Sequence, residues 1–322
     1  MSKSSICSNQ LALYTKPKSN ALQSAVQYIK KNFWLYLLLI PGVAYFLIFH
    51  YAPMYGILIA FKDFDVVKGV WNSSWIGLDN FTYLFKSKDF FNILSNSIII
   101  SFYRLFFGFP APIILAILLN EVRSNTYKRT IQTILYLPHF ISWVVITGII
   151  YVFLSPSTGV VNLMINEFGG KSIAFLQEPK YFRSIIVLSG IWKETGWGTI
   201  VYLSAITSID VEQYEAAFID GANRLQTILY ITLPSIMSTI VVLLILRMGN
   251  ILRNGFEQIF LLYNPMVYNV ADVFETYSYR VGILEGRFSY STAVGIFQSV
   301  VGLIFIMSSN YLSRKVNDAG LW

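Results

Sequence analysis

Two charged residues, Lys193 and Glu194, lie inside the apolar stretch 184–206 of this 322-residue chain. If the stretch is a helix, they lie roughly 14 Å from its outer end, near the middle of a membrane. Ionisable residues at that depth are costly and usually face a cavity or a partner. Trp192 and Trp197 flank the pair, and a broad aromatic face beside hydrogen-bonding groups suits a sugar ring. The pattern predicts a sugar-binding surface; the alternative is that Lys193 and Glu194 hold the helix bundle together or pair with another subunit.

A polar interruption at 211–235 follows this stretch. Asp210 can cap a short helix, with Gln213 reaching back to it, and Gly221 provides a left-handed stop. The predicted helix has an apolar stripe and a small face at Ala216 and Ala217, which suits docking into a cleft of a partner. The alternative is an amphipathic connector at the level of the lipid headgroups. The residues of the stripe are Val211, Tyr214, Ala217, Phe218 and Gly221.

Residues for chemical catalysis are scarce. The chain has one cysteine, Cys7, and two histidines, His50 and His139, which is a poor basis for a disulfide or a metal site. A phosphate-binding loop requires G-x-x-x-x-G-K-[ST]. The segment 165–172 ends in Gly-Lys-Ser but begins with isoleucine in place of the first glycine, so the match is accidental. We expect no enzyme activity, no cofactor and no metal.

The elements that carry these residues are predicted to be membrane helices. Hydrophobic residues make up 55% of the chain and charged residues 13%, which excludes an ordinary soluble domain. About 20 apolar residues cross a bilayer, and this length predicts an all-α membrane protein with six transmembrane helices. The predicted spans are 33–49 with an apolar extension to 61, 92–119, 130–154, 184–206, 235–252 and 292–311.

Basic residues predict the orientation. The net charge is +7, yet no basic repeat with interleaved aromatics indicates nucleic acid. Lysines and arginines gather in the N-terminal tail, the link before residue 130, the loop after the fourth span and the C-terminus. By the positive-inside rule these parts, and both termini, are cytoplasmic. The predicted organisation is a cytoplasmic tail at 1–30 and a six-span domain at 31–322, with a cytoplasmic loop at 209–227.

This loop carries a family pattern. Glu215-Ala216-Ala217, followed by Asp220-Gly221-Ala222 and Ile231-x-Leu233-Pro234, resembles the EAA loop of the membrane subunits of bacterial ATP-binding-cassette (ABC) importers. The wider sequence is similar to maltose-type carbohydrate permeases, above all to the LplB-like polysaccharide permeases, in GIWKETGWGTIVYL, GFEQIFLLYNP, ETYSYRVG and the terminal Gly320-Leu321-Trp322.

The resemblance implies a type I ABC importer permease fold, located in the cell membrane and working by alternating access. Its partners would be a second permease subunit, expected to be a related chain in a heterodimer, two ABC ATPase subunits, an extracellular solute-binding protein and an oligosaccharide or polysaccharide fragment. The predicted ATPase-coupling residues are Tyr214, Glu215, Ala216, Ala217, Phe218, Asp220 and Gly221.

The same resemblance implies where the substrate passes. The predicted substrate-lining residues are Lys193, Glu194, Trp197, Asn250, Asn254 and Glu257. Arg247 and Arg253 lie near them, where maltose-type permeases are largely neutral, and serve either an acidic sugar or the structure. Arg104 is expected to extend to the outer headgroups, outside the site.

Two other classes of protein compete with this interpretation. An ion-coupled secondary sugar carrier would have paired repeats and discontinuous helices around its ion sites, and no repeat is present in the sequence. A membrane enzyme would need a nucleophile with its base, or a metal cluster, and neither is found. Uptake measured with ATP depleted and ion gradients intact separates importer from carrier, because only a carrier would continue.

Overall fold

The computed structural model describes residues 28–317, and Cys7 and the terminal Gly320-Leu321-Trp322 lie outside them. The chain forms two compact units, Met1–Gly56 and Ile57–Trp322. The described part of the first unit is one helical run, which continues to Phe61 and is apolar and long enough to cross a membrane. It consists of α2 (Phe33–Phe46), the π-helical η1 (Leu47–Tyr51) and the 3-10 helix η2 (Ala52–Phe61).

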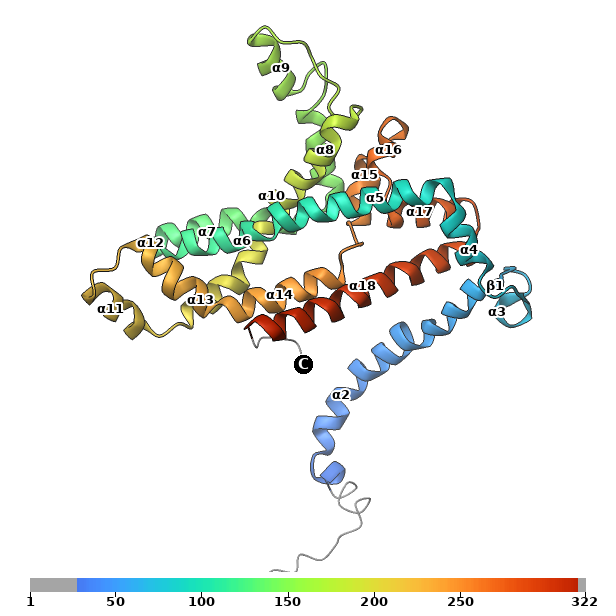
Figure 1. Ribbon diagram of the computed structural model, residues 1–322, viewed down its shortest axis with the longest axis horizontal. Helices are drawn as coiled ribbons and strands as arrows, with labels where there is room; N and C mark the ends of the chain where they lie inside the picture. Colours follow the sequence, from blue (N-terminus) through green and yellow to red (C-terminus); the bar gives the residue numbers. More distant parts are fainter. Residues whose placement is uncertain (1–27, 318–322) are drawn as a thin grey trace, which may run out of the picture. The chain divides into compact units, whose positions relative to one another are not determined.

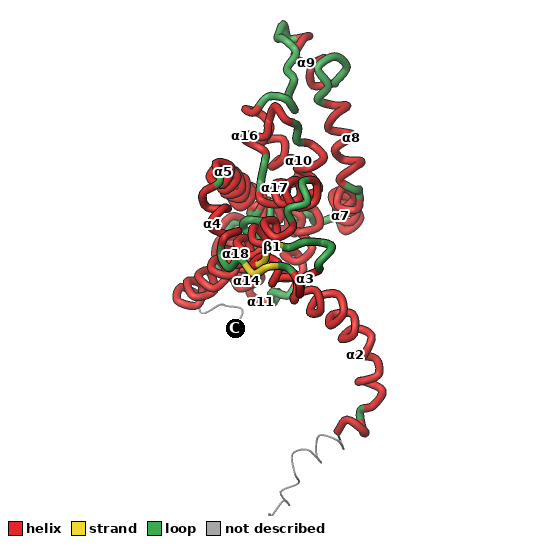
Figure 2. The backbone as a smooth tube through the Cα atoms, turned by 90° about the vertical axis from the view of Figure 1, so that its right-hand side faces the viewer, coloured by secondary structure: helices red, strands yellow, loops and turns green. Residues whose placement is uncertain are grey.

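The second unit is almost entirely helical, with one two-stranded antiparallel ribbon (Figures 1 and 2). Its elements are β1 (Lys62–Asp63), α3 (Gly69–Asn72), β2 (Ser74–Trp75), α4 (Asp79–Lys86), α5 (Lys88–Tyr103), η3 (Arg104–Gly108), α6 (Pro110–Asn120), α7 (Asn125–Phe140), α8 (Trp143–Phe153), α9 (Val160–Glu167), α10 (Pro179–Thr207), α11 (Val211–Ile219), α12 (Arg224–Thr227), η4 (Ile228–Thr232), α13 (Leu233–Ser235), α14 (Met237–Gly249), α15 (Phe256–Leu262), η5 (Pro265–Val267), α16 (Tyr268–Ala271), α17 (Phe274–Tyr279), η6 (Arg280–Leu284) and α18 (Phe288–Asn317).

Several predicted spans are confirmed as long apolar helices. Lys88–Asn120 and Phe288–Lys315 can each cross a membrane by length and composition. Two bent helix pairs pass the same test only when each pair is taken as one crossing. The remaining long helix, α10, has 29 residues, enough to span the hydrocarbon despite its charges. With the run Phe33–Phe61, three helices pass the test, or up to five segments if each bent pair is one crossing, and the length of α10 is compatible with the sixth predicted crossing.

The third predicted span, 130–154, is not one straight helix. The chain turns by 98° between α7 and α8. Pro138 lies in the last turn of α7, and Ile141 is extended. The Ser142 hydroxyl then accepts a hydrogen bond from the Val145 amide and caps a new helix. In Figure 1, α8 accordingly leaves α7 in a new direction.

The start of the fifth span was also predicted wrongly. The helical segment begins at Arg224 rather than after Pro234, and the chain bends by 60° before α14. Asn223 and Gln226 form the capping box that begins it. At the other end α14 stops at Gly249, and residues 250–255 are not helical before α15 starts. Non-helical backbone inside a membrane is tolerated where it is buried in protein or lines a cavity.

The segment 253–291, between the last two predicted spans, forms short helices that supply much of the core. Ile259, Val267 and Phe274 are among the residues with no exposed surface. They belong to two apolar clusters that also include residues of α5, α10 and α18. Because each helix is only four to seven residues long, periodicity could not reveal them.

Helix α10 is the central element, since it packs against α5, α6, α7, η3 and α14. Glycine permits the closest approach of α10 to a neighbouring helix. A Cβ atom built on Gly196 would lie 1.9 Å from the Leu135 carbonyl oxygen of α7. A similar approach joins α14 to α18, where a Cβ on Gly302 would meet the Gly249 carbonyl oxygen at 2.5 Å. Small residues let membrane helices come together in this way.

Candidate functional site

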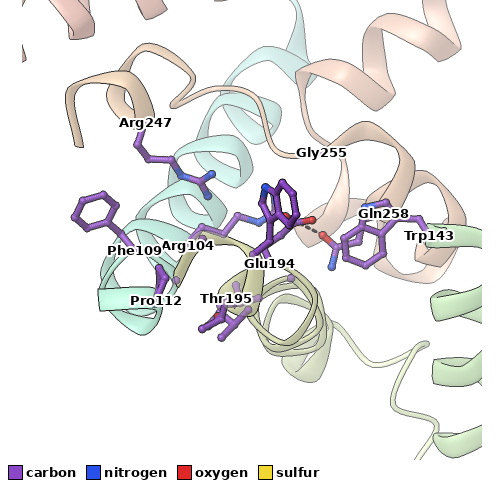
Figure 3. Close-up of a pocket in the computed structure, with 15 residues that line it drawn as sticks. Arg104, Phe109, Pro112, Trp143, Glu194, Thr195, Arg247, Gly255 and Gln258 are labelled. Carbon is purple, nitrogen blue, oxygen red and sulfur yellow. Dashed lines mark hydrogen bonds between the residues drawn. The ribbon is translucent and has the colours of Figure 1, made fainter. Parts of the chain in front are cut away.

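A cavity of about 380 Å³ lies where α10 meets η3, the end of α14 and the start of α15. Figure 3 shows the side chains that line it, which come from these elements and from the starts of α6 and α8. Polar and charged groups are mixed with aromatic rings in its wall. The residues with functional groups are Arg104, Trp143, Glu194, Thr195, Trp197, Arg247 and Gln258.

Arg104 faces this cavity, so the prediction that it extends to the headgroups is wrong. Its Nη2 donates to Gln258 Oε1 at 2.5 Å. Gln258 Nε2 in turn donates to the Ile186 carbonyl and to Ser189 Oγ, both at 2.8 Å. The Nε of Arg104 has no hydrogen-bond partner among the described residues. Gln258 therefore holds the guanidinium in place, while Glu275 and Glu194 act on its charge without a salt bridge to it among the described residues.

Arg247 is the second cation in the wall. It makes no salt bridge within the described part of the chain, and it is close enough to Arg104 for the two like charges to interact. Glu194 is the one carboxylate among the lining residues that the structure describes. Among the lining residues two guanidinium groups thus accompany one carboxylate, and Glu275 of α17, which does not line the cavity, also acts on the charge of Arg104.

Trp197 and Glu194 lie in the cavity wall, and His139 of α7 contacts both. The imidazole stacks on the Trp197 indole with ring centres 4.6 Å apart and planes within 4°. His139 Nδ1 lies 3.1 Å from Glu194 Oε2. Phe140 adds an edge-to-face contact to Trp197. His139 does not itself line the cavity.

Lys193 was predicted to line the substrate path, and the structure places it elsewhere. It is buried, and its Nζ donates to the carbonyl oxygens of Pro138, His139 and Ile141 at 3.3, 2.7 and 2.5 Å. These carbonyls end α7, where backbone acceptors have no partner within the helix. Lys193 therefore holds the bend between α7 and α8, which is the bundle-stabilising alternative.

The three predicted residues from the end of the fifth span do not line this cavity. Asn254 is fully buried, accepts from Ser101 Oγ at 3.0 Å and donates to the Ser97 carbonyl at 3.2 Å. Asn250 donates to the Leu246 carbonyl of its own helix. Glu257 is exposed. The fifth span reaches the cavity instead through Arg247 on α14, with Gln258 following on α15.

A signal for the missed residues was present in the sequence. An ionisable residue within an apolar span indicates a functional position by default, and this rule applied to Arg104 as well as to Lys193 and Glu194. Trp143 could not be found in this way. It reaches the cavity only because the chain bends before α8, and that bend was not predicted.

The predicted helix at 211–220 is confirmed as α11. Asp210 Oδ1 caps it by accepting from the Glu212 amide at 3.1 Å, and Gly221 has the left-handed φ of 77° that the stop requires. The cap of α11 involves only the Asp210 side chain, without the predicted second hydrogen bond from Gln213. A complete capping box occurs instead at the next helix, α12. The helix is joined to η4 by a hydrogen bond between Tyr214 and Thr232.

Helix α11 carries large apolar side chains that are not buried in this chain. Phe218 and Ile219 are 83% and 84% exposed. Of the predicted coupling residues, Tyr214 and Ala217 are half-buried toward the rest of the chain. The others are exposed, namely Glu215, Ala216, Phe218, Asp220 and Gly221. Exposed apolar side chains on a short helix are typical of a docking surface.

Comparison with known proteins identifies the family. Residues 108–318 match the model of the binding-protein-dependent transport system inner membrane component family. Protein LplB of Bacillus subtilis (strain 168) is 53% identical over 294 residues, 91% of this chain and 92% of LplB. The polygalacturonan/rhamnogalacturonan transport system permease protein YteP of the same organism is 47% identical, with 90% of each chain covered.

Two solved structures of ABC transporters contain chains that are similar to this one. A chain in the crystal structure of a bacterial ABC transporter involved in the import of the acidic polysaccharide alginate has a TM-score of 0.85 and 47% identity, and covers 91% of this chain and 99% of that one. A second structure of a bacterial alginate ABC transporter, in complex with an alginate pentasaccharide-bound periplasmic protein, has a TM-score of 0.84. This chain belongs to the family of inner membrane components of binding-protein-dependent transport systems, and it is a membrane permease rather than an enzyme.

Proposed function

We propose that this chain is the permease subunit of an ABC importer that carries an acidic oligosaccharide across the cell membrane. The observation that supports this substrate class is the cavity, where two guanidinium groups and two tryptophans accompany a single carboxylate. Carboxylates pair with guanidinium groups through strong charge-assisted hydrogen bonds, and sugar faces stack on indole rings. The names of YteP and of the alginate transporters indicate polysaccharides of this kind for those relatives.

Transport would be driven by partner subunits. We propose that α11 docks on an ABC ATPase through Phe218 and its exposed neighbours, while Tyr214 anchors the helix to η4. Closure of two such ATPases would then move this chain and a related second permease, so that the cavity opens alternately to each side. A solute-binding protein would deliver the sugar from outside, as in the alginate transporter crystallised with its periplasmic protein.

The substrate class is tested with arginine variants. Replacing Arg247 by alanine should lower the affinity of the purified complex for an alginate pentasaccharide about ten-fold or more, because a charge-assisted hydrogen bond contributes about 1.5–3 kcal/mol. Binding of maltopentaose, a neutral sugar of the same length, should change little. The matched control is Arg253→Ala, which removes an exposed arginine that does not line the cavity. Equal affinities for the acidic sugar in both variants would contradict the proposed role of Arg247.

The docking role of α11 is tested with Phe218→Asp. A carboxylate should not enter an apolar cleft without a partner charge, so we expect the ATPase to be lost when the tagged permease is purified. The control is Val67→Asp, which places the same charge on a side chain that is 94% exposed outside α11. Glu215→Ala should weaken the association less, since an exposed ion pair contributes about 1 kcal/mol or less. Normal recovery of the ATPase with Phe218→Asp would exclude this docking surface.

The proposed orientation places both termini in the cytoplasm. After replacement of Cys7, single cysteines at Ser124 and Ser208 should be protected from an impermeant thiol reagent in intact cells. Cysteines at Val67 and Ser172 should react. All four positions are exposed on the chain, so protection reflects the membrane rather than burial, and the reverse pattern would invert the topology.

A further inference from the structure

His139 is the one residue that contacts both Trp197 and Glu194 across the α7–α10 boundary, among the contacts that the structure describes. It lies near the end of α7, beside the bend. Its own carbonyl accepts a 2.7 Å hydrogen bond from the buried Lys193. The backbone that carries the imidazole is thereby fixed to the same helix as its two contacts.

The stack leaves one face of the indole for a ligand. The imidazole covers the other face at 4.6 Å with nearly parallel planes, and Phe140 covers an edge. Trp197 nevertheless remains 46% exposed and lines the cavity. A sugar ring can therefore stack only on the face opposite His139, and the imidazole determines the plane that this face presents.

The hydrogen bond has a similar effect on Glu194. Its side chain is 54% exposed, and a glutamate with that much freedom would sample several rotamers. The contact at 3.1 Å ties Oε2 to His139 Nδ1 and leaves Oε1 free of this bond, on a residue that lines the cavity. For this bond the imidazole must carry its proton on Nδ1, since an ionised carboxylate only accepts.

We propose that His139 is a positioning residue of the sugar site, which fixes the indole face and the carboxylate oxygen that meet the substrate. The inference rests on the proposed function and assigns a role to a residue outside the cavity wall. Pre-organised groups bind more tightly because less side-chain entropy is lost when the ligand arrives. His139 would thus set affinity and selectivity without touching the sugar.

Three replacements of His139 distinguish the effect of its stack on Trp197 from that of its hydrogen bond to Glu194. His139→Phe keeps a ring for the stack and removes the hydrogen bond, His139→Asn keeps a donor and removes the stack, and His139→Ala removes both. We expect the Kd of the purified complex for an alginate pentasaccharide to rise at least ten-fold with alanine and less with phenylalanine or asparagine. His50→Ala, which changes the other histidine of the chain, should leave the Kd unchanged.

A double-mutant cycle tests the link to Glu194. His139→Phe should raise the Kd about five-fold in the natural background and less than two-fold when Glu194 is already methionine, because methionine cannot accept the imidazole's hydrogen bond. Additive effects in the cycle, or an unchanged Kd for His139→Ala, would overturn the positioning role.

A measurement without substrate separates this inference from the proposed function. In protein labelled with 5-fluorotryptophan, the ¹⁹F signal of Trp197, assigned by Trp197→Phe, should be a single narrow line in the natural protein and in His139→Phe. It should broaden or split in His139→Ala as the indole becomes free to move. An unchanged line in the alanine variant would refute the inference even if the sugar binds. Failure of the natural complex to bind any acidic sugar, with the expected line changes, would refute the proposed substrate class alone.

Discussion

Gly196→Ala is expected to prevent recovery of correctly folded permease, although it adds a single methyl group. The new Cβ would lie 1.9 Å from the Leu135 carbonyl oxygen and 2.5 Å from its carbon. These are backbone atoms of α7, so no side-chain rotation relieves the contact, and the two helices must separate. Overpacking in a close-packed interior typically costs about 1–3 kcal/mol, and a backbone clash belongs at or above the upper end.

The measurement is the yield of monodisperse protein after extraction in mild detergent. Gly148→Ala is the matched control, because Gly148 lies on α8 and a Cβ there meets nothing within 4 Å. Alanine favours the helix by roughly 1 kcal/mol over glycine, so this variant should be at least as stable as the natural protein. Equal yields from the two variants would mean that α7 and α10 do not approach as described.

Lys193→Met is expected to give the second largest effect. Methionine has a similar length but cannot donate, so the carbonyls of Pro138, His139 and Ile141 lose the bonds that hold the bend. An unsatisfied buried polar group costs about 1–3 kcal/mol, and three acceptors are affected. We expect the melting temperature of the purified protein to fall by roughly 5 °C or more.

Lys180→Met is the control on the same helix, since Lys180 is exposed near the start of α10 and its loss should change the melting temperature little. The comparison also separates the two interpretations of Lys193. A variant that melts normally but no longer binds the acidic oligosaccharide would return Lys193 to the substrate path. A variant that melts early confirms its role at the bend.

The parts of this molecule that follow local rules could be predicted from its sequence. The length of the mainly apolar stretches predicted the helices that contain residues 92–119 and 292–311. Local capping chemistry predicted α11, where Asp210 and Gly221 act as expected. In both cases the signal lies within one turn or one run of the chain, so no tertiary contact was needed to interpret it.

The remaining features depend on contacts between distant segments. The 98° bend needs Lys193 of another helix to donate to the free carbonyls at the end of α7, and the presence of Pro138 and Ser142 in the sequence does not show that donor. Asn254 looked like a substrate ligand because it is polar within an apolar region. Its side chain is instead satisfied by Ser97 and Ser101 of α5.

Only half of the candidate site could be predicted from the sequence. Glu194 and Trp197 could be placed from the depth of α10 in the membrane, because one helix carries both. Arg104 and Arg247 reach the same cavity from η3 and α14, and only the packed bundle shows that their charges meet. The feature that indicates an acidic substrate is therefore a property of the fold rather than of any single stretch.

The most direct test of the central claim is uptake by proteoliposomes that contain the complex purified through a tag on this chain, with its solute-binding protein added outside. With ATP enclosed and no ion gradient, labelled alginate pentasaccharide should accumulate, and maltopentaose should not. Omission of ATP should stop uptake even when an ion gradient is imposed. Accumulation driven by the gradient without ATP, or a preference for the neutral sugar, would contradict an ATP-driven importer of acidic oligosaccharides.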